Sequence, residues 1–460
     1  MRAIADPTNA LGRGLEAIRR QFQVPDGFPP AVLEAAEQAA ARIPSQHADR
    51  TDIPFVTLDP ASSTDLDQAF WIEQSGSDLL LHYAIADVGW FVDDGGPIDI
   101  EAWTRGTTYY LPDGKAGLYP PVLSEGAASL LPDGPRPAII FTVRVGPDGN
   151  VKLDGAERAL VQSRAKLAYD LVSDEELPPG FAELAKRIEG AEARRGAARV
   201  DPPEQEVVAN GDGRYRLLFR PMAKAEQRNA ALSLATNLAI ADALLAHHTG
   251  LFRVMGEPDR RSIKRLRHSA KALGLDWPKP MSLDELERSL DPADPKHASF
   301  MLAIRRAGAP AGYTPYRDGV VPWHSAMAAT YVHATAPLRR LADRYVVEGV
   351  LAIANGRAVP EEVVEAFPKL PEIMDRADAR SNQIERAAID LAETVVLHGR
   401  EGKTFEAVVT DLDERGARIQ LCKLPVIARV AANGAETGDR VEVRLVSADP
   451  DRRELRFEQV

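Results

Sequence analysis

Three aspartates in one short segment are the residues of this chain best suited to do chemistry. Asp59, Asp65 and Asp67 lie between two apolar runs, within the segment Thr57–Phe70. Carboxylate oxygens without a nearby histidine or cysteine suit Mg²⁺, with Mn²⁺ as a second candidate, better than zinc. A magnesium ion held by a few carboxylates is typical of phosphate chemistry. A solvated acidic turn is the alternative, because aspartate also stabilises turns.

A second segment, Tyr331–Arg340, combines aromatic, hydroxyl and guanidinium groups. Pro337 is placed like the first-turn proline of a helix, with Thr335 close to the N-cap. Helix N-termini bind phosphate through free N–H groups, and Arg339 adds a planar fork suited to phosphate oxygens. Arg339 could instead pair with Asp343 one turn on. Together with the aspartates, a phosphate site is the better interpretation.

The elements that must position these residues are short strands followed by helices. Ile53–Leu58 and Ala69–Ile72 read as strands on either side of the aspartates, and sites are commonly built where strands end. Further strands are predicted at residues 79–86 and 138–143, with a hairpin turn at 146–149, and helices at 230–247, 361–373 and 375–398. This order predicts an α+β fold with a mixed catalytic body.

The two ends of the chain differ from this body. Helical spacing over Asn9–Gln23, and a second helix from Pro30, predict a short helical N-terminal segment. It is either a helix-turn-helix module or a brace against the next domain, and we favour the brace. Five short strands after residue 402, with a turn predicted at Asp413–Gly416, fit an OB-type β-barrel, a fold that commonly binds single-stranded nucleic acid. Lys403, Phe405 and Arg418 are candidates for that face, although Phe405 fits a core position equally well.

Composition narrows the class of protein. The chain has 460 residues and a net charge of -12, which argues against a surface that coats nucleic acid indiscriminately but leaves room for a basic channel. We find no apolar run long enough to cross a bilayer and no signal-peptide core, so we expect a cytoplasmic location. The single cysteine, Cys422, excludes an intrachain disulfide and is interpreted as a small core residue.

The order of these motifs resembles the catalytic (RNB) domain of the ribonuclease II / ribonuclease R family. The acidic segment, the strand end Ile85–Trp90 and the segment Tyr331–Arg340 carry the resemblance, and blocks at 108–112, 120–131, 166–169 and 250–254 agree. It covers the chain from about residue 25 onward. The resemblance implies a processive 3′→5′ exoribonuclease that hydrolyses single-stranded RNA to nucleoside 5′-monophosphates. It further implies a narrow basic channel, Mg²⁺ at the acidic motif, a monomer, and no membrane or protein partner.

The resemblance also assigns roles to single residues. Asp59, Asp65 and Asp67 match three of the family's four aspartates, and Arg339 matches the arginine that holds the scissile-end phosphate. For RNA binding, Tyr110 matches a stacking aromatic, Tyr169 a tyrosine near the terminal nucleotide, and Glu385 a glutamate near the terminal base. The predicted catalytic residues are Asp59, Asp65, Asp67 and Arg339, and the predicted metal site adds Gln68 to the three aspartates. The predicted RNA-binding residues are Tyr110, Tyr169, Tyr331, Thr335, Arg339, Arg340, Glu385 and Phe405.

Three features depart from the family pattern. Gln68 stands where the fourth aspartate is expected, which weakens the case for two metal ions. Ala230 and Ala231 replace a glutamate pair at the start of the long helix. A helical segment stands in place of the family's N-terminal cold-shock barrels. The predicted domains are therefore a helical segment over residues 1–48, an RNB-type domain over 49–398 and an OB-fold RNA-binding domain over 399–460.

Two other functions are compatible with these residues. Gln68 and the lost glutamates suggest an RNA-binding or regulatory protein built on a decayed catalytic domain. A metal phosphoesterase acting on small nucleotides is a third alternative, but such an enzyme needs neither the barrel nor Tyr110.

Overall fold

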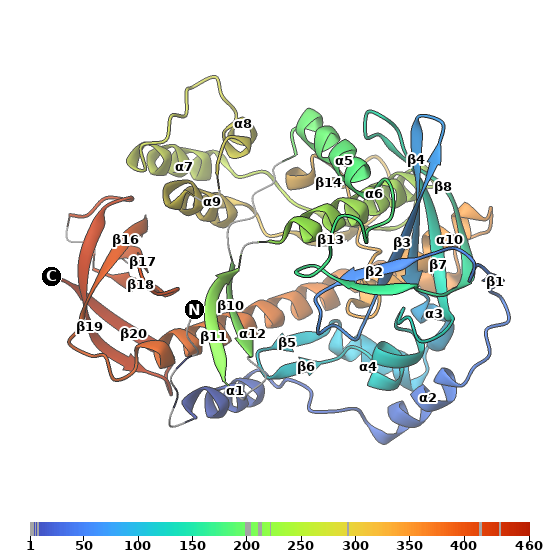
Figure 1. The fold of residues 1–460 in the computed structure, drawn as a ribbon, viewed down its shortest axis with the longest axis horizontal. Helices are drawn as coiled ribbons and strands as arrows, with labels where there is room; N and C mark the ends of the chain where they lie inside the picture. Colours follow the sequence, from blue (N-terminus) through green and yellow to red (C-terminus); the bar gives the residue numbers. More distant parts are fainter. Residues whose placement is uncertain are drawn as a thin grey trace.

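The computed structural model describes the whole chain except residues 1–3, 5, 7–8, 198–203, 210–213, 221, 292–293, 414–415 and 432–433. A large body of mixed helices and strands is joined by one long helix, α12, to a small β-barrel at the C-terminus (Figure 1). The α+β architecture expected from the sequence is confirmed.

A seven-stranded sheet forms the centre of the large body, in the order β1–β8–β7–β4–β3–β2–β9. β1 pairs with β8 and β2 pairs with β9 in parallel, whereas the other neighbours are antiparallel. Residues 137–141 of β7 are all buried, because neighbouring elements cover the sheet on both faces. The strands are β1 (Ala48–Asp49), β2 (Val56–Asp59), β3 (Gln68–Ser75), β4 (Asp78–Ala86), β7 (Arg136–Val145), β8 (Val151–Val161) and β9 (Ala165–Ala168).

Helix α6 (Lys224–Ala246) packs on strands β7 and β8. It also contacts the helices α5 (Phe181–Arg195) and α10 (Leu341–Ala354). It begins earlier than predicted, so Ala230 and Ala231 lie inside it. By length and composition α6 could cross a bilayer, contrary to our expectation that no run is long enough. Most of its apolar window (61%) is buried within the fold, as in the core helix of a folded domain.

The N-terminal helices pack against later elements rather than forming a module of their own. α1 (Ala10–Gln21) buries Leu11, Leu15 and Ile18 against α12, and α2 (Pro30–Ala40) packs on α4 (Pro97–Arg105). These contacts support the brace interpretation. α2 also packs on α3 (Val88–Phe91) and on the short π-helix η1 (Leu123–Ala127). The hairpin of β5 (Tyr109–Leu111) and β6 (Gly114–Ala116) follows α4 in the chain.

Several smaller elements complete the body. α7 (Arg260–Ala272), α8 (Leu283–Arg288) and α9 (Pro295–Ala307) form a helical unit with its own small core around Leu266 and Phe300. The remaining elements are the pairs β10 (Glu204–Ala209) with β11 (Tyr215–Arg220), β12 (Leu251–Val254) with β13 (Gly312–Pro315) and β14 (Trp323–His324) with β15 (Ala329–Thr330), and the short η2 (Ser325–Met327).

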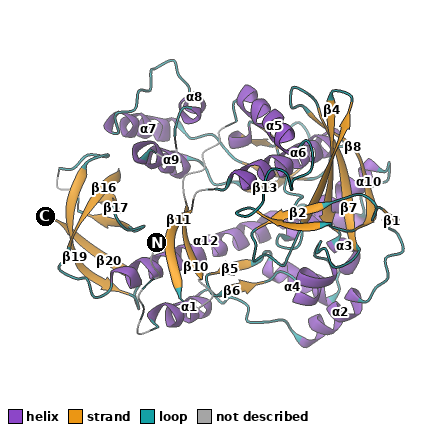
Figure 2. Ribbon diagram, viewed as in Figure 1, coloured by secondary structure: helices purple, strands orange, loops and turns teal. Residues whose placement is uncertain are grey.

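The end of the chain follows the predicted strand pattern but not the predicted helix break. The helices are α11 (Glu361–Ala366) and α12 (Leu370–Leu397), because Pro371 lies in the first turn of α12 and favours a helix start there. The five strands predicted for the barrel are confirmed (Figure 2). They are β16 (Thr404–Asp413), β17 (Gly416–Leu421), β18 (Ile427–Val430), β19 (Arg440–Asp449) and β20 (Glu454–Gln459), in the order β18–β17–β16–β19–β20.

Two details of the barrel differ from expectation or lie outside the description. Cys422 is exposed, so its interpretation as a core residue is wrong; β17 ends at Leu421, and the chain has already left the barrel wall. The turn predicted at 413–416 includes residues 414–415, which lie outside the described residues.

Candidate active site

Three segments that are far apart in the sequence meet at the ends of strands β2 and β3 of the central sheet. β2 ends at Asp59, the following loop carries Asp65 and Asp67, and β3 begins at Gln68. The segment after Arg105 pairs with the Arg339 segment, through Thr108 N–H to the Arg339 carbonyl at 3.0 Å. The aspartate loop and the arginine segment, both picked out in the sequence, are therefore neighbours in space.

Asp67 is the residue that joins the acidic loop to the arginine segment. Its side chain is buried and accepts a hydrogen bond from the Leu338 N–H at 2.7 Å, and Arg339 Nε lies 3.4 Å from its other oxygen. Burial raises the pKa of Asp67 to about 7, although Arg339 and the Leu338 N–H act in the opposite direction. Arg339 itself keeps 45% of its side chain exposed, so part of its fork faces solvent.

Asp59 lies beside this pair with no comparable partner. Among the described residues, no hydrogen bond or ion pair reaches its carboxylate, and burial raises its pKa to about 6. Arg339 and Lys166 lower the pKa of Asp59, whereas Asp65 raises it further. Tyr169, directly after β9, is its neighbour: the Tyr169 N–H donates to the Asp59 carbonyl at 3.2 Å, and the Tyr169 hydroxyl accepts from Asn229 Nδ2 at 3.0 Å.

Asp65 is held by the hairpin β5–β6. Lys115 Nζ lies 2.9 Å from Oδ1 of Asp65, and the Tyr110 hydroxyl donates to Oδ2 at 3.3 Å. Tyr110 and Lys115 are cross-strand partners in the hairpin, which places both side chains on one face. Lys115 also contacts Glu125 at 3.1 Å, so one ammonium group links two carboxylates.

The segment Tyr331–Arg340 is a turn rather than the helix start that we predicted. α10 begins only at Leu341, because Asp343 accepts the Ala336 N–H at 2.8 Å and pairs with Arg340 at 2.7 and 2.9 Å. These bonds hold Pro337 and its neighbours in an irregular loop. Asp343 therefore binds Arg340, not Arg339, which leaves the Arg339 fork toward the aspartates.

The other predicted RNA-binding residues fall into two groups. Tyr110 is 50% exposed beside Asp65, and Glu385 is exposed on α12. Thr335 is buried and hydrogen-bonds Ser233 at 2.9 Å, and the Tyr331 hydroxyl is 3.4 Å from Asn237 Nδ2. Phe405 packs edge-on against Phe457 on the barrel core, as its alternative interpretation expected.

Sequence reasoning missed residues that the tertiary structure adds to the site. Lys115 reaches Asp65 from the hairpin, and Glu125 on η1 contacts the same lysine. Tyr83 on β4 donates a hydrogen bond to the Gln68 side-chain oxygen. Asn237 on α6 accepts the Ala334 N–H at 3.0 Å and so fixes the arginine segment. None has a local sequence signal, because each depends on strand pairing or helix packing.

The site fits a cation held by few protein ligands. Within the described part of the chain, no three carboxylate, histidine or cysteine side chains gather closely enough to form a metal-binding group. Asp65 is already occupied by Lys115. Asp59 and Asp67 remain as two largely buried carboxylates whose pKa values are raised by burial, and a positive charge placed beside them would favour their ionised forms. Mg²⁺ commonly binds through one or two carboxylates and keeps several waters.

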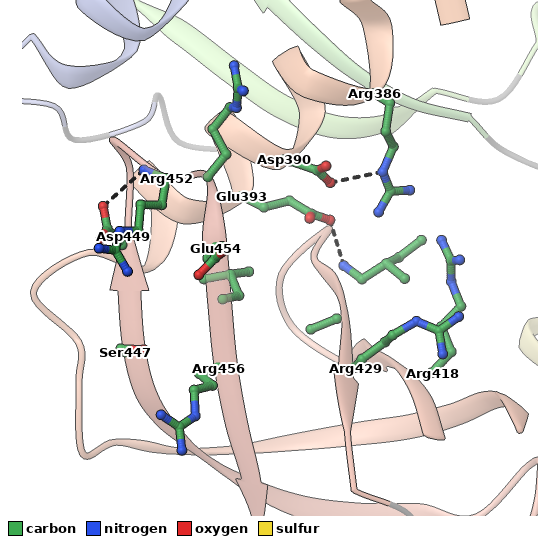
Figure 3. A pocket seen from close by; sticks show the side chains of 14 residues that line it. Arg386, Asp390, Glu393, Arg418, Arg429, Ser447, Asp449, Arg452, Glu454 and Arg456 are labelled. Atoms are coloured by element: carbon green, nitrogen blue, oxygen red, sulfur yellow. Dashed lines mark hydrogen bonds and ion pairs between the residues drawn. The ribbon is translucent and has the colours of Figure 1, made fainter. Parts of the chain in front are cut away.

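A second candidate site lies where α12 meets the barrel (Figure 3). A pocket of about 460 Å³ is lined by six arginines and four carboxylates: Arg386, Arg418, Arg429, Arg452, Arg453, Arg456, Asp390, Glu393, Asp449 and Glu454. Burial and then the nearby positive charges of Arg306, Arg386 and Arg429 lower the pKa of Arg418 to about 10. This guanidinium lies in an excess of positive charge, which an anionic group would relieve.

Comparison with known proteins agrees with this geometry. Residues 47–354 match the family model described as RNB domain, and residues 403–460 match the model described as RNase II-type exonuclease C-terminal S1 domain. Ribonuclease R of Aquifex aeolicus is 24% identical over 97% of this chain, and that of Escherichia coli is 25% identical over 97%. The chain spans 70% and 62% of the length of these two relatives.

Solved structures show the same fold. Mycoplasma genitalium RNase R in complex with ribose-methylated single-stranded RNA has a TM-score of 0.86 at 19% identity, covering 100% of this chain and 79% of that one. Yeast Ssd1, a pseudonuclease, has a TM-score of 0.69 at 16% identity, covering 96% of this chain and 59% of that one. The fold alone therefore does not decide between a nuclease and a protein without nuclease activity.

Proposed function

Because the chain belongs to the RNB-domain family of exoribonucleases, we propose that it hydrolyses single-stranded RNA processively from the 3′ end and releases nucleoside 5′-monophosphates. One observation carries the proposal. The buried Asp67 is bound by both the Leu338 N–H and Arg339, so the acidic loop and the arginine segment form one site. A solvated acidic turn would not bury a carboxylate against an arginine that is far away in the sequence.

In this proposal, different residues bind the phosphate, the metal ion and the bases. Arg339 binds the scissile phosphate through the exposed part of its fork, whose parallel N–H groups match phosphate oxygens. Asp59 and Asp67 hold a divalent ion such as Mg²⁺. When bound, that ion supplies charge neutralisation and a more acidic water. Tyr110 offers an exposed ring on which a base stacks, and Tyr169 lies beside Asp59 where the terminal nucleotide would end.

The arginine pocket between α12 and the barrel is the proposed contact for the RNA upstream of the site. Guanidinium groups bind backbone phosphates without reading sequence, which suits a processive enzyme. Arg418, Arg429 and Arg456 of the barrel line this pocket together with Arg386 of α12 (Figure 3). A strand held there is anchored while its 3′ end is shortened.

The alternative is an RNA-binding or regulatory protein without catalysis. Gln68 motivates it, because the side-chain oxygen of Gln68 already accepts a hydrogen bond from Tyr83 and carries no charge for a metal. The retained Asp59, Asp67 and Arg339 favour the nuclease.

A time course on a 5′-labelled single-stranded oligoribonucleotide, with Mg²⁺ or with EDTA, separates the two functions. Metal-dependent conversion to one short limit product with few intermediates supports the exoribonuclease. Asp67→Asn should keep RNA binding and abolish nucleotide release, because the ion loses a charged ligand. Intact RNA under both conditions, with binding retained, would establish the alternative.

A further inference from the structure

Lys115 occupies a place in the acidic site that no motif assigns to it. Its ammonium group lies 2.9 Å from Asp65 and 3.1 Å from Glu125, with 23% of the lysine side chain exposed. Two carboxylates from different segments therefore point at one positive charge. This is the arrangement in which a small divalent ion is commonly found, with the ammonium group at the position of the ion.

The surroundings of Lys115 fix it in this place. Lys115 is the cross-strand partner of Tyr110, and the two side chains bind different oxygens of Asp65. Glu125 is held from its other side by the Thr64 hydroxyl at 3.0 Å. The ammonium thus has a preorganised pair of acceptors, unlike a lysine on a solvated surface, which pays side-chain entropy for each contact.

The neighbouring position, Gln68, also offers no negative charge to a second divalent ion. Gln68, which is neutral, follows Asp67 directly and spends its side-chain oxygen on Tyr83. Gln68 is uncharged, and Asp65 is bound by Lys115 and Tyr110. Of the three aspartates of the acidic segment, this leaves Asp59 and Asp67 for an added cation. A second divalent ion beside Asp65 would stand against the Lys115 charge at short range, where repulsion is strong.

We propose that Lys115 is a built-in cation that takes the place of a divalent ion at Asp65, so that the chain binds a single divalent ion through Asp59 and Asp67. In this proposal Lys115 is a positioning residue: it holds Asp65 and Glu125 and presents Tyr110, and it does not touch the reacting phosphate. The proposal builds on the metal site of the proposed function, but its test below counts ions and needs no nuclease activity.

The test is a count of bound Mn²⁺ by electron paramagnetic resonance, on protein without RNA at pH 8. The wild-type protein should bind one ion per chain. Lys115→Met should bind a second ion, because Asp65 and Glu125 are then free to hold it, whereas Lys115→Arg should keep the count at one. Lys152→Met is the matched control, since Lys152 is 76% exposed on β8, and it should leave the count unchanged.

Aspartate variants give an independent arm if Lys115→Met folds poorly, as judged by its thermal melt. Asp65→Asn should keep the single Mn²⁺, and Asp59→Asn and Asp67→Asn should each weaken its binding at least tenfold. The proposal is overturned by a wild-type count of zero or two, by an unchanged count in Lys115→Met, or by loss of the ion in Asp65→Asn. If the protein fails to degrade RNA but these counts hold, the proposed function falls and the role of Lys115 stands.

Discussion

At the scale of single residues, the active site is defined by which charges have partners. Asp65 is bound on both oxygens, and Asp67 is bound by one N–H and one guanidinium. Among the described residues, no hydrogen bond or ion pair reaches the Asp59 carboxylate. Burial raises the pKa of Asp59 and of Asp67 because a charged carboxylate loses its hydration there. The unsatisfied charge is the reason to expect a cation at this position.

The raised pKa of Asp67, about 7, makes the stability of the metal-free protein depend on pH. The folded state holds this proton more tightly than the unfolded chain, so stability is lost as pH rises from the ordinary aspartate pKa toward 7. Asn is neutral at every pH. The free energy of unfolding of Asp67→Asn, relative to that of the wild type, should therefore rise by roughly 3 kcal/mol between pH 5 and pH 8. Urea unfolding in EDTA at both pH values measures the difference, and a constant difference would contradict the assignment of burial as the cause.

Arg339 should act through its fork rather than its charge alone. Arg339→Ala should lower kcat/KM on a short oligoribonucleotide by about 10²–10³-fold, the usual effect of removing a donor to a developing charge. Arg339→Lys should recover little, because a point charge cannot make the paired contacts. Arg20→Ala is the control, as Arg20 is 73% exposed on α1. Equal activity in Arg339→Lys and the wild type would show that charge suffices.

At the scale of elements, the site is built by three segments that brace one another. The arginine segment hangs between α6, through Asn237, and the first turn of α10, through Asp343. The hairpin β5–β6 reaches across to Asp65 from the other side. Each contact comes from a different element, so the geometry of the site is a property of their packing.

Asp343 is the clearest case of an element holding the site without touching substrate. It is fully buried, accepts the Ala336 N–H and pairs with Arg340. Asp343→Ala leaves the Arg340 guanidinium without its partner, and removing one member of a buried pair typically costs about 3–5 kcal/mol. The melting temperature should fall accordingly. In the exposed pair of Lys369 with Glu365, Glu365→Ala should change stability by less than about 1 kcal/mol.

At the scale of the whole molecule, an acidic chain gathers arginines in the pocket where we propose that RNA binds. The net charge is -12, yet six arginines surround the pocket between α12 and the barrel. α12 packs against both α1 and the barrel strands β19 and β20, so it connects the barrel to the body that carries the aspartates. In the proposed function, a strand bound at the barrel and cut beside Asp67 would therefore span the two parts of the molecule.

This arrangement predicts that substitutions at the arginine pocket affect long RNA substrates and leave short ones unchanged. Arg418→Ala combined with Arg456→Ala should weaken binding of a long single strand and lower the slope of log affinity against log salt by about 1.4, as expected for two lost phosphate contacts. Cleavage of an oligomer too short to reach the barrel should be unchanged. Arg444→Ala serves as the control, because Arg444 on β19 pairs with Glu458 and does not line the pocket. Equal losses on short and long RNA would place these arginines in the catalytic site instead.

The sequence by itself indicated which residues could form the site and which helices and strands the fold would contain. Carboxylate type and spacing indicated a site around Asp59, Asp65 and Asp67, and alternation predicted the five strands of the barrel, because both signals are local. Helix ends were predicted less well: the break in the last helices and the start of α10 depend on Pro371 and on the buried Asp343. A local pattern cannot include a hydrogen bond that forms only after folding.

Tertiary structure alone decided how the charges are paired. Nothing in the spacing of Lys115 indicates that it meets Asp65, since the contact requires the hairpin to fold back over the aspartate loop. The same holds for the exposure of Arg339 and the engagement of Arg340, adjacent residues with different surroundings. Charges act over a few ångströms, whereas the sequence records only order along the chain, so the partners of a charge emerge when distant segments pack together.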